Sequence, residues 1–270
     1  MLARILIDNN TRDALCPEWG LSAWIEYEGH VILLDTGASG RFAENARALG
    51  LPLDKVEYGV LSHAHYDHSD GLEAFFEENR TASFYLRKGA KENCYSSRKY
   101  YLKYIGIRKG LLEKYKDRIV YADGDMELIP GAVLMPHKTP DLKSAGKRAG
   151  MYVRRGLFWT PDSFEHEQSL VLETEKGLVI FNSCSHGGAD NIIRETEQTW
   201  PGKKIYALVG GLHLFRSSDE EVRALAVRVK DLGIEKIYTG HCTGARAMEL
   251  LEEELGDVVE QIYTGMEIRI

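Results

Sequence analysis

The chain has 270 residues, of which 44% are hydrophobic and 28% are charged, and its formal net charge is −7. This length supports one large core, and the acidic balance argues against a protein whose main partner is nucleic acid. No apolar run reaches 18 residues, so we expect no transmembrane helix, and the four widely spaced cysteines contain no CxxC pair, which favours a reducing cytoplasm.

Short strands alternate with helices along the first third of the chain. The sequence predicts strands over 3–8 and 22–28, and an apolar run over 30–37 that ends in an Asp-Thr-Gly turn. A helix over 41–50 closes at Gly50. A strand over 56–62 and a helix over 71–79 follow.

The last third of the chain repeats this alternation. Residues 168–188 predict a hairpin that turns at Lys176–Gly177 and ends in a loop. Further helices are predicted over 189–198, 218–232 and 244–255, and strands that run into loops are predicted over 203–213 and 236–244. A strand ends the chain over 266–270. Each polar cluster follows the C-terminal end of a strand, which is where open α/β layers present their sites.

The segment 87–118 differs from the rest in its charge. It holds eleven Lys and Arg residues against three acidic ones, a local balance of +8 that leaves the remainder at −15, and five tyrosines are interleaved. This pattern fits an anionic substrate, because lysine and arginine bind phosphate and tyrosine stacks on a flat ring. A solvated helical face and a single-stranded nucleic-acid site are the alternatives, and the acidic remainder disfavours the second.

Residues 60–71, VLSHAHYDHSDG, gather three histidines and two aspartates after a short apolar run. On an extended backbone His63 and His65 face the same side, so both imidazoles reach one ion. The turn residues that follow redirect Asp67 and His68 toward a second ion. Imidazole and carboxylate ligands suit zinc, manganese or iron better than calcium or magnesium. The alternative interpretation is a polar surface loop with scattered histidines.

Three later histidines also follow apolar runs and are flanked by glycine, which lets the backbone approach an ion closely. They are His186 in FNSCSHGG, His213 in LVGGLHLF and His241 in IYTGHCTG. A metal site that the first motif leaves incomplete needs such donors. The other histidines lack this context, and for them we expect surface or structural roles: His30, His137 and His166.

The motif HAHYDH resembles the HxHxDH motif of the metallo-β-lactamase superfamily. The stretches DTGASGRFAENARALGL, NSCSHGGADNII, VGGLHLF and GHCTG are similar to the branch named for dihydropterin–ribofuranosylaminobenzene 5′-phosphate synthase. This resemblance covers nearly the whole chain. It implies one α/β domain over residues 1–270, folded as a four-layer αβ/βα sandwich, with 87–118 as a basic, tyrosine-rich insertion.

The resemblance also implies two divalent metal ions, Zn²⁺ first and Mn²⁺ or Fe²⁺ as alternatives. One ion is then held by His63, His65 and His186, and the other by Asp67, His68 and His241. Where related hydrolases carry a bridging aspartate this chain reads NSCSH, so Cys184 and His213 are further candidate ligands. Asp35 resembles a carboxylate that orients a ligand imidazole, and its alternative role is that of a turn residue.

These features predict a dinuclear metalloenzyme that acts on a phosphorylated small molecule. It is either a phosphoester-type hydrolase or a dihydropterin-type transferase that displaces diphosphate, with Asp67 as metal ligand and proton acceptor. A di-iron oxidoreductase and a metal-containing binding or regulatory protein are the alternatives. The candidate substrate-binding residues are Arg87, Lys88, Arg98, Lys99, Tyr101 and His213.

Overall fold

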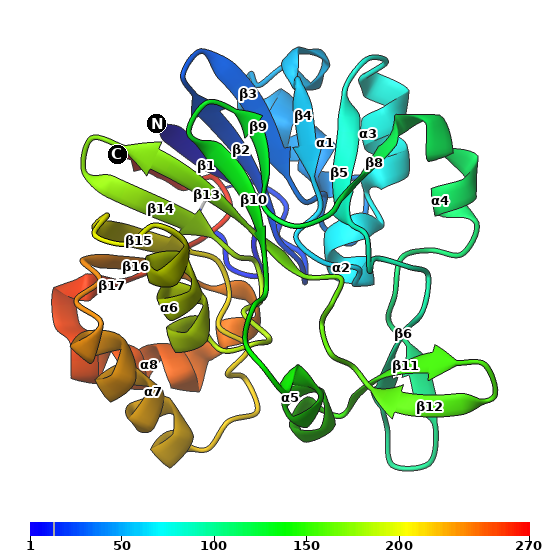
Figure 1. The fold of residues 1–270 in the computed structure, drawn as a ribbon. Helices are drawn as coiled ribbons and strands as arrows, with labels where there is room; N and C mark the ends of the chain where they lie inside the picture. Colours follow the sequence, from blue (N-terminus) through cyan, green and yellow to red (C-terminus); the bar gives the residue numbers. More distant parts are fainter. Residues whose placement is uncertain (13) are drawn as a thin grey trace.

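The computed structural model of the chain describes residues 1–12 and 14–270. Two large sheets pack face to face, and helices cover the outer face of each (Figure 1). This arrangement is the four-layer αβ/βα sandwich that the resemblance to the metallo-β-lactamase superfamily implies. The predicted helices and the predicted strands are confirmed, within one or two residues at most of their ends.

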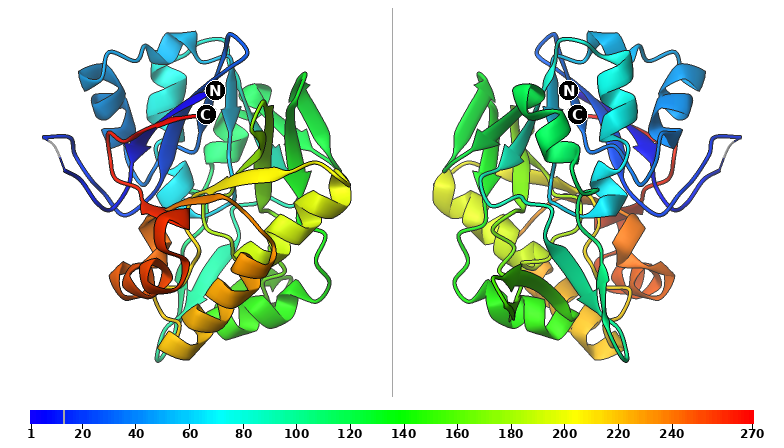
Figure 2. Two further views of the ribbon diagram at one scale, coloured as in Figure 1. Left: turned by 90° about the vertical axis from the view of Figure 1, so that its left-hand side faces the viewer. Right: turned by 90° about the vertical axis from the view of Figure 1, so that its right-hand side faces the viewer.

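The first sheet has seven strands, which come mostly from the N-terminal half. In spatial order they are β18 (Glu267–Arg269), β1 (Leu2–Ile7), β2 (Ser22–Tyr27), β3 (His30–Leu34), β4 (Tyr58–Val60), β5 (Ser83–Arg87) and β8 (Ile119–Ala122). The strands from β3 to β8 run parallel. Because β1 pairs with β18, the two termini lie side by side (Figure 2). The outer face is covered by α1 (Arg41–Ala48) and α3 (Leu72–Glu78), with the short η1 (Leu53–Lys55) beside them.

The second sheet also has seven strands and carries the C-terminal half. In spatial order they are β17 (Val259–Gln261), β16 (Lys236–Thr239), β15 (Ile205–Val209), β14 (Gly177–Phe181), β13 (Gln168–Thr174), β10 (Ala132–Pro136) and β9 (Met126–Ile129). From β14 to β17 the strands are parallel. Its outer face is covered by α6 (Ala189–Thr199), α7 (Asp219–Asp231) and α8 (Ala245–Leu255), and η4 (Gly256–Val258) follows α8.

A third, four-stranded sheet stands beside the sandwich (Figure 1). Its order is β12 (Phe158–Pro161), β11 (Met151–Arg155), β6 (Cys94–Ser97) and β7 (Leu102–Tyr104). The basic segment 87–118 supplies β6 and β7, together with α4 (Leu111–Lys114) and η2 (Lys116–Arg118). Its partner strands follow α5 (Leu142–Ala149), more than thirty residues later. The small sheet is therefore built from two separate segments of the chain.

Three apolar clusters fill the spaces between the four layers. Side chains alternate across each strand, so neighbours on β14 serve different clusters. Val179 joins the cluster between the two sheets, while Ile180 packs under α6 and α7. Phe42 of α1 and Phe75 of α3 fill the third space, and all four side chains are fully buried, which contributes roughly 1.5–3 kcal/mol each.

The hairpin between β13 and β14 turns one residue earlier than predicted. Thr174 pairs with Gly177, which leaves Glu175 and Lys176 as the two turn residues. Gly177 has φ +128°, and a Cβ there would lie 2.6 Å from the Lys204 carbonyl oxygen. The glycine is thus required by the close strand neighbour as well as by its backbone conformation.

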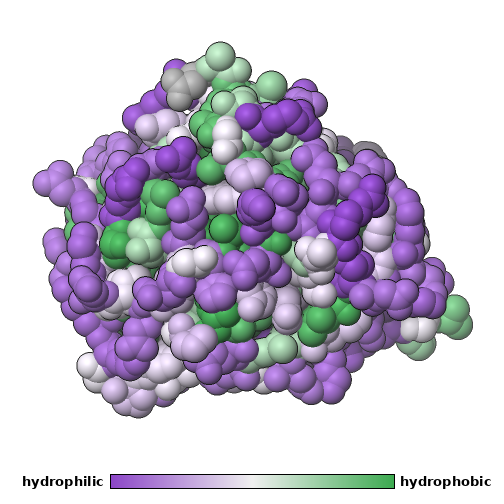
Figure 3. Space-filling view, turned by 90° about the horizontal axis from the view of Figure 1, so that it is seen from above, coloured by the Kyte–Doolittle hydropathy of each residue, from purple (hydrophilic) through white to green (hydrophobic). Residues whose placement is uncertain are grey.

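The parallel strands of both sheets end at one common edge of the sandwich. The loops that leave β3, β4, β14, β15 and β16 there carry Asp35, His63, His186, His213 and His241. The opposite side, seen from above in Figure 3, is largely hydrophilic, with hydrophobic residues in small separate areas. Among the helices of the described residues, none is long and apolar enough to cross a membrane.

Candidate metal centre

The HAHYDH segment begins as extended chain and ends in one helical turn. His65 has φ −97° and ψ 151° and caps α2 (Tyr66–Ser69), which carries Asp67 and His68. The extended part is held by the segment after β7: the Tyr66 amide donates to the Ile105 carbonyl at 2.9 Å. The first two histidines and the next two polar residues therefore point to neighbouring positions, as the sequence predicts.

The first group of donors contains His63, His65 and His186. One ring nitrogen of each lies within 4.8 Å of the others, and all three side chains are buried. His63 Nδ1 lies 2.8 Å from Ser62 Oγ, and His186 Nδ1 bonds to the Glu167 carboxylate. Within the described residues the Nε2 atoms of all three histidines are buried without a hydrogen-bond partner. Three such nitrogens facing one space form a site for a cation.

The second group contains Asp67, His68 and His241. The Nε2 atoms of the two histidines lie 3.3 Å apart, and Asp67 Oδ2 lies 3.5 Å from His241 Nε2 and 4.0 Å from His68 Nε2. His68 Nδ1 faces the Asp35 carboxylate at 2.7 Å and His241 Nδ1 faces Asn9 Oδ1 at 3.0 Å. Each Nδ1 must donate to such an acceptor, so each neutral ring turns a lone pair at Nε2 toward the other. A cation shared by the two rings, or a proton on the His68 ring, makes this contact favourable.

Asp35 supports a histidine of each group, His68 directly and His63 through Ser62. Its carboxylate accepts hydrogen bonds from the Ser62 amide at 2.7 Å, from the Ser62 and Ser183 hydroxyls at 2.6 Å each, and from His68 Nδ1. Asp35 is completely buried and has φ +56°. A buried carboxylate with this many donors fixes the orientation of the ligand ring that it contacts.

Charge and burial set the protonation of the donor histidines. Burial, reinforced by the neighbouring imidazoles, lowers the pKa of His63, His65 and His241. Burial also lowers the pKa of His68, but the charges of Asp35 and Asp67 outweigh it and raise this pKa to about 8. Most of the donor rings are therefore neutral near pH 7, which is the form that binds metal.

A family model described as the metallo-beta-lactamase superfamily matches residues 20–241. The chain belongs to this superfamily. The resemblance that the HxHxDH motif indicates is thus confirmed, and so is the predicted fold class.

Individual relatives extend this result over the whole chain. The 7,8-dihydropterin-6-methyl-4-(β-D-ribofuranosyl)-aminobenzene-5′-phosphate synthase of Methanocaldococcus jannaschii is 28% identical over 94% of this chain and 91% of its own. The uncharacterized protein MJ0448 of the same organism is 27% identical over 93% and 94%. The crystal structure of Tm1679, a metal-dependent hydrolase of the beta-lactamase superfamily, superposes with a TM-score of 0.85 at 29% identity and covers 100% of this chain and 99% of its own.

The two additional candidate ligands of this metallo-β-lactamase-type chain, Cys184 and His213, also lie at the centre. Cys184 Sγ is 3.3 Å from His68 Nε2, and it belongs to one donor set with His63 and to another with His186 and His213. The Nδ1 atom of His213 is buried without a hydrogen-bond partner in the part of the chain that the structure describes. The structure thus brings together all eight candidate metal ligands.

Sequence reasoning did not identify several residues that support the donors. Glu167 holds both His186 and His137, whose Nε2 lies 2.8 Å from it. Trp19 donates its indole N–H to Asp67 Oδ2 at 2.8 Å. Neither residue stands in a recognisable motif, and only the packing of distant segments brings them to the site.

His166 lies against the first group and shares a further buried donor set with His65, Cys94 and Asp162, but its own hydrogen bonds favour a structural role. Its ring is buried, 5.4 Å from that of His65, so a surface role is excluded. The Ala64 amide donates to its Nδ1 at 3.2 Å, which requires a lone pair there and places the proton on Nε2, facing Asp162 at 3.0 Å. Its role is therefore structural, as is that of the buried His137, whereas His30 is partly exposed beside Glu57.

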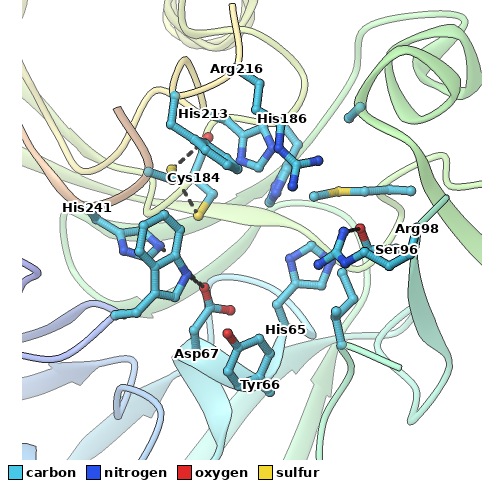
Figure 4. A pocket seen from close by; sticks show the side chains of 16 residues that line it. His65, Tyr66, Asp67, Ser96, Arg98, Cys184, His186, His213, Arg216 and His241 are labelled. Carbon is cyan, nitrogen blue, oxygen red and sulfur yellow. Dashed lines mark hydrogen bonds and ion pairs between the residues drawn. The ribbon is translucent and has the colours of Figure 1, made fainter. Parts of the chain in front are cut away.

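A cavity opens over the donors (Figure 4). Aromatic and apolar side chains form part of its lining, including Trp19, Tyr66 and Met151, and two arginines, Arg98 and Arg216, enter it from different loops. Arg98 is held by the Ser96 hydroxyl at 2.7 Å, and Arg216 lies over the Phe215 ring. Among the described residues neither arginine pairs with a carboxylate. Two such cations beside a metal centre suit an anionic ligand.

Of the other candidate substrate-binding residues, His213 also lines this cavity, whereas the remaining four do not. Arg87 donates to the Gly124 carbonyl and lines a second cavity beside His137. Lys88 pairs with Asp123 on the surface, Lys99 lies over the Tyr100 ring, and Tyr101 is 63% exposed. Of the basic segment, therefore, Arg98 is the predicted cation that reaches the metal centre.

Proposed function

We propose that the chain is a dinuclear metal-dependent enzyme that acts on a phosphorylated small molecule. His63, His65 and His186 hold one divalent ion, and Asp67, His68 and His241 hold the other. Two ions held there lower the pKa of a water molecule and stabilise charge on a phosphoryl oxygen. Zn²⁺ suits this donor set best, since imidazole nitrogens dominate it and Asp67 supplies a carboxylate.

One observation carries this proposal: in the first group the buried Nε2 atoms of His63, His65 and His186 have no hydrogen-bond partner among the described residues. In the second group His68 Nε2 and His241 Nε2 face each other at 3.3 Å, and the hydrogen bonds at both Nδ1 atoms keep the rings from turning away.

The chain's own residues provide the rest of the chemistry. Asp67 faces the cavity with its second oxygen and accepts the proton of the attacking group, while Asp35 keeps the His68 ring in place. Arg98 and Arg216 bind the phosphate of the substrate, and Trp19 and Tyr66 offer flat faces for a ring. The relatives include a 5′-phosphate synthase and a metal-dependent hydrolase, so they support both kinds of reaction.

The first experiment is a metal analysis. We expect about two transition-metal ions per chain, and we expect His65→Ala to lose metal and activity together. The metal-loaded chain is then tested against a phosphodiester, a phosphomonoester, and a diphosphate ester with and without an aromatic amine. Transfer that depends on the amine indicates a transferase, and release of product without it indicates a hydrolase.

Three results decide against the proposal. Full activity in metal-free protein removes the metal from the reaction. Two iron ions with a visible absorption band and redox turnover favour the oxidoreductase. Tight binding of a phosphate ester without any turnover favours a binding or regulatory protein.

A further inference from the structure

The sulfur of Cys184 occupies a place that neither metal group explains. It lies 3.3 Å from His68 Nε2, in the same donor set as His63, and in another set with His241 and Cys242. The Cys184 side chain is 97% buried, yet it forms part of the wall of the cavity over the metal centre (Figure 4). A free thiol that packs only for volume has no need to face a ligand nitrogen.

The spacing of the second group identifies what is missing from it. Two nitrogen ligands of one tetrahedral zinc ion lie about 3.3 Å apart, and a nitrogen and a sulfur ligand lie about 3.6 Å apart. The observed separations are 3.3 Å between His68 and His241, 3.5 Å between His241 and Asp67, 4.0 Å between His68 and Asp67, and 3.3 Å between His68 and Cys184. The three protein donors thus lie close to tetrahedral distances. The sulfur lies at ligand distance from His68 and in one donor set with His241.

We propose that Cys184 is the fourth protein ligand of the ion that Asp67, His68 and His241 hold, and that it binds as a thiolate. This inference rests on the proposed dinuclear site and adds one ligand to it. It also separates the two ions by chemistry: the first has only imidazole donors, whereas the second has a soft sulfur donor, which favours zinc over manganese or magnesium.

The surroundings of Cys184 suit a metal-bound sulfur. Cys242 Sγ lies 3.4 Å away, within hydrogen-bonding distance, so its S–H donates to the bound sulfur. Cys242 is equally buried, which makes it the natural control residue.

The test uses the full chain loaded with Co²⁺ in place of the native metal. A thiolate ligand gives cobalt an intense near-ultraviolet charge-transfer band, whereas imidazole and carboxylate ligands give only weak visible bands. We expect the band in the wild-type chain and in Cys242→Ser. We expect Cys184→Ser to lose the band and to bind the second ion more than tenfold more weakly in chelator competition. Cys184→Asp should bind two ions without the band.

The outcomes separate this inference from the proposed function. Two bound cobalt ions without a charge-transfer band in the wild-type chain overturn the inference and leave the dinuclear enzyme standing. A band that survives Cys184→Ser but disappears in Cys242→Ser identifies Cys242 as the sulfur ligand and overturns the inference. A chain that binds no cobalt overturns both. Cys184→Asp guards against a folding artefact, because its carboxylate restores a donor at the same place.

Discussion

Replacing Asp35 by asparagine tests whether one buried charge holds the metal centre together. Asparagine has nearly the same shape and tolerates the φ of +56° at this position, so the substitution removes the charge without straining the backbone. In the native chain Oδ1 accepts one hydrogen bond, from the Ser62 amide, and Oδ2 accepts three, from Ser62 Oγ, Ser183 Oγ and His68 Nδ1.

The cost follows from counting these donors. Whichever way the amide turns, its NH₂ group faces at least one N–H or O–H donor. The best orientation keeps three bonds to a neutral oxygen, each weaker by about 1 kcal/mol than a bond to a carboxylate, and leaves the Ser62 amide unsatisfied at about 1–3 kcal/mol. We therefore expect Asp35→Asn to lower the free energy of unfolding by about 4–6 kcal/mol. His68 becomes less basic, and the affinity for the second ion should fall about 10- to 100-fold.

Urea unfolding of the metal-free chain measures the first effect, and chelator competition followed by metal analysis measures the second. Ser183→Ala is the matched control, because it removes one of the four donors and keeps the charge. It should cost about 1 kcal/mol and change metal affinity only a few-fold. Two ions bound to Asp35→Asn with wild-type affinity, and an unchanged urea midpoint, refute the reasoning.

Three further predictions concern other parts of the molecule. Burial lowers the pKa of His137, but Glu167 and Glu195 outweigh it and raise this pKa to about 9. Protonated His137 therefore adds roughly 3 kcal/mol to the free energy of unfolding below about pH 6.5, and this contribution is lost by about pH 9. Urea unfolding at several pH values measures the loss, and His137→Gln should flatten the pH dependence. A Cβ at Gly71 would lie 2.2 Å from the Thr36 carbonyl oxygen, so Gly71→Ala should cost 1–3 kcal/mol or more in thermal unfolding, against about 1 kcal/mol for Gly29→Ala, which meets only open space. Arg98→Ala should raise KM for a phosphorylated substrate about tenfold, whereas Lys88→Ala, outside the cavity, should not; equal effects contradict the placement of the substrate.

The two outer thirds of the chain could be predicted because their patterns are long and regular. Alternating apolar residues, closing glycines and an amphipathic stretch gave the strands and helices of both large sheets. The middle of the chain offered no such signal. The small sheet uses strands of three to five residues, and β6 finds its partner β11 more than fifty residues later. The local pattern of apolar residues does not indicate pairing between strands so far apart in the sequence.

The candidate site likewise contains residues that the sequence predicts and residues that it does not. Candidate ligands that directly follow a strand, such as His63 and His241, stand in motifs that can be recognised in the sequence. The residues that orient them do not: Asn9 fixes the His241 ring and Glu167 fixes the His186 ring from other parts of the chain. Their contribution depends on tertiary packing, so the sequence gives only their chemical type. For the basic segment the sequence predicted too many site residues. Its charge suggested several phosphate contacts, but of its five candidate substrate-binding residues only Arg98 lines the cavity.

Backbone strain marks the site more sharply than composition does. Of the seven non-glycine residues with positive φ in the described chain, four lie at the metal centre: Asp35, Ser185, His213 and His241. Each such conformation costs on the order of 1 kcal/mol or more, and none is a glycine that would adopt it freely. The surrounding hydrogen bonds offset this cost, as where the Asp8 carboxylate accepts from the His241 amide at 2.8 Å. Glycine at Asp35, His213 or His241 would relieve the backbone but would remove a side chain of the candidate site.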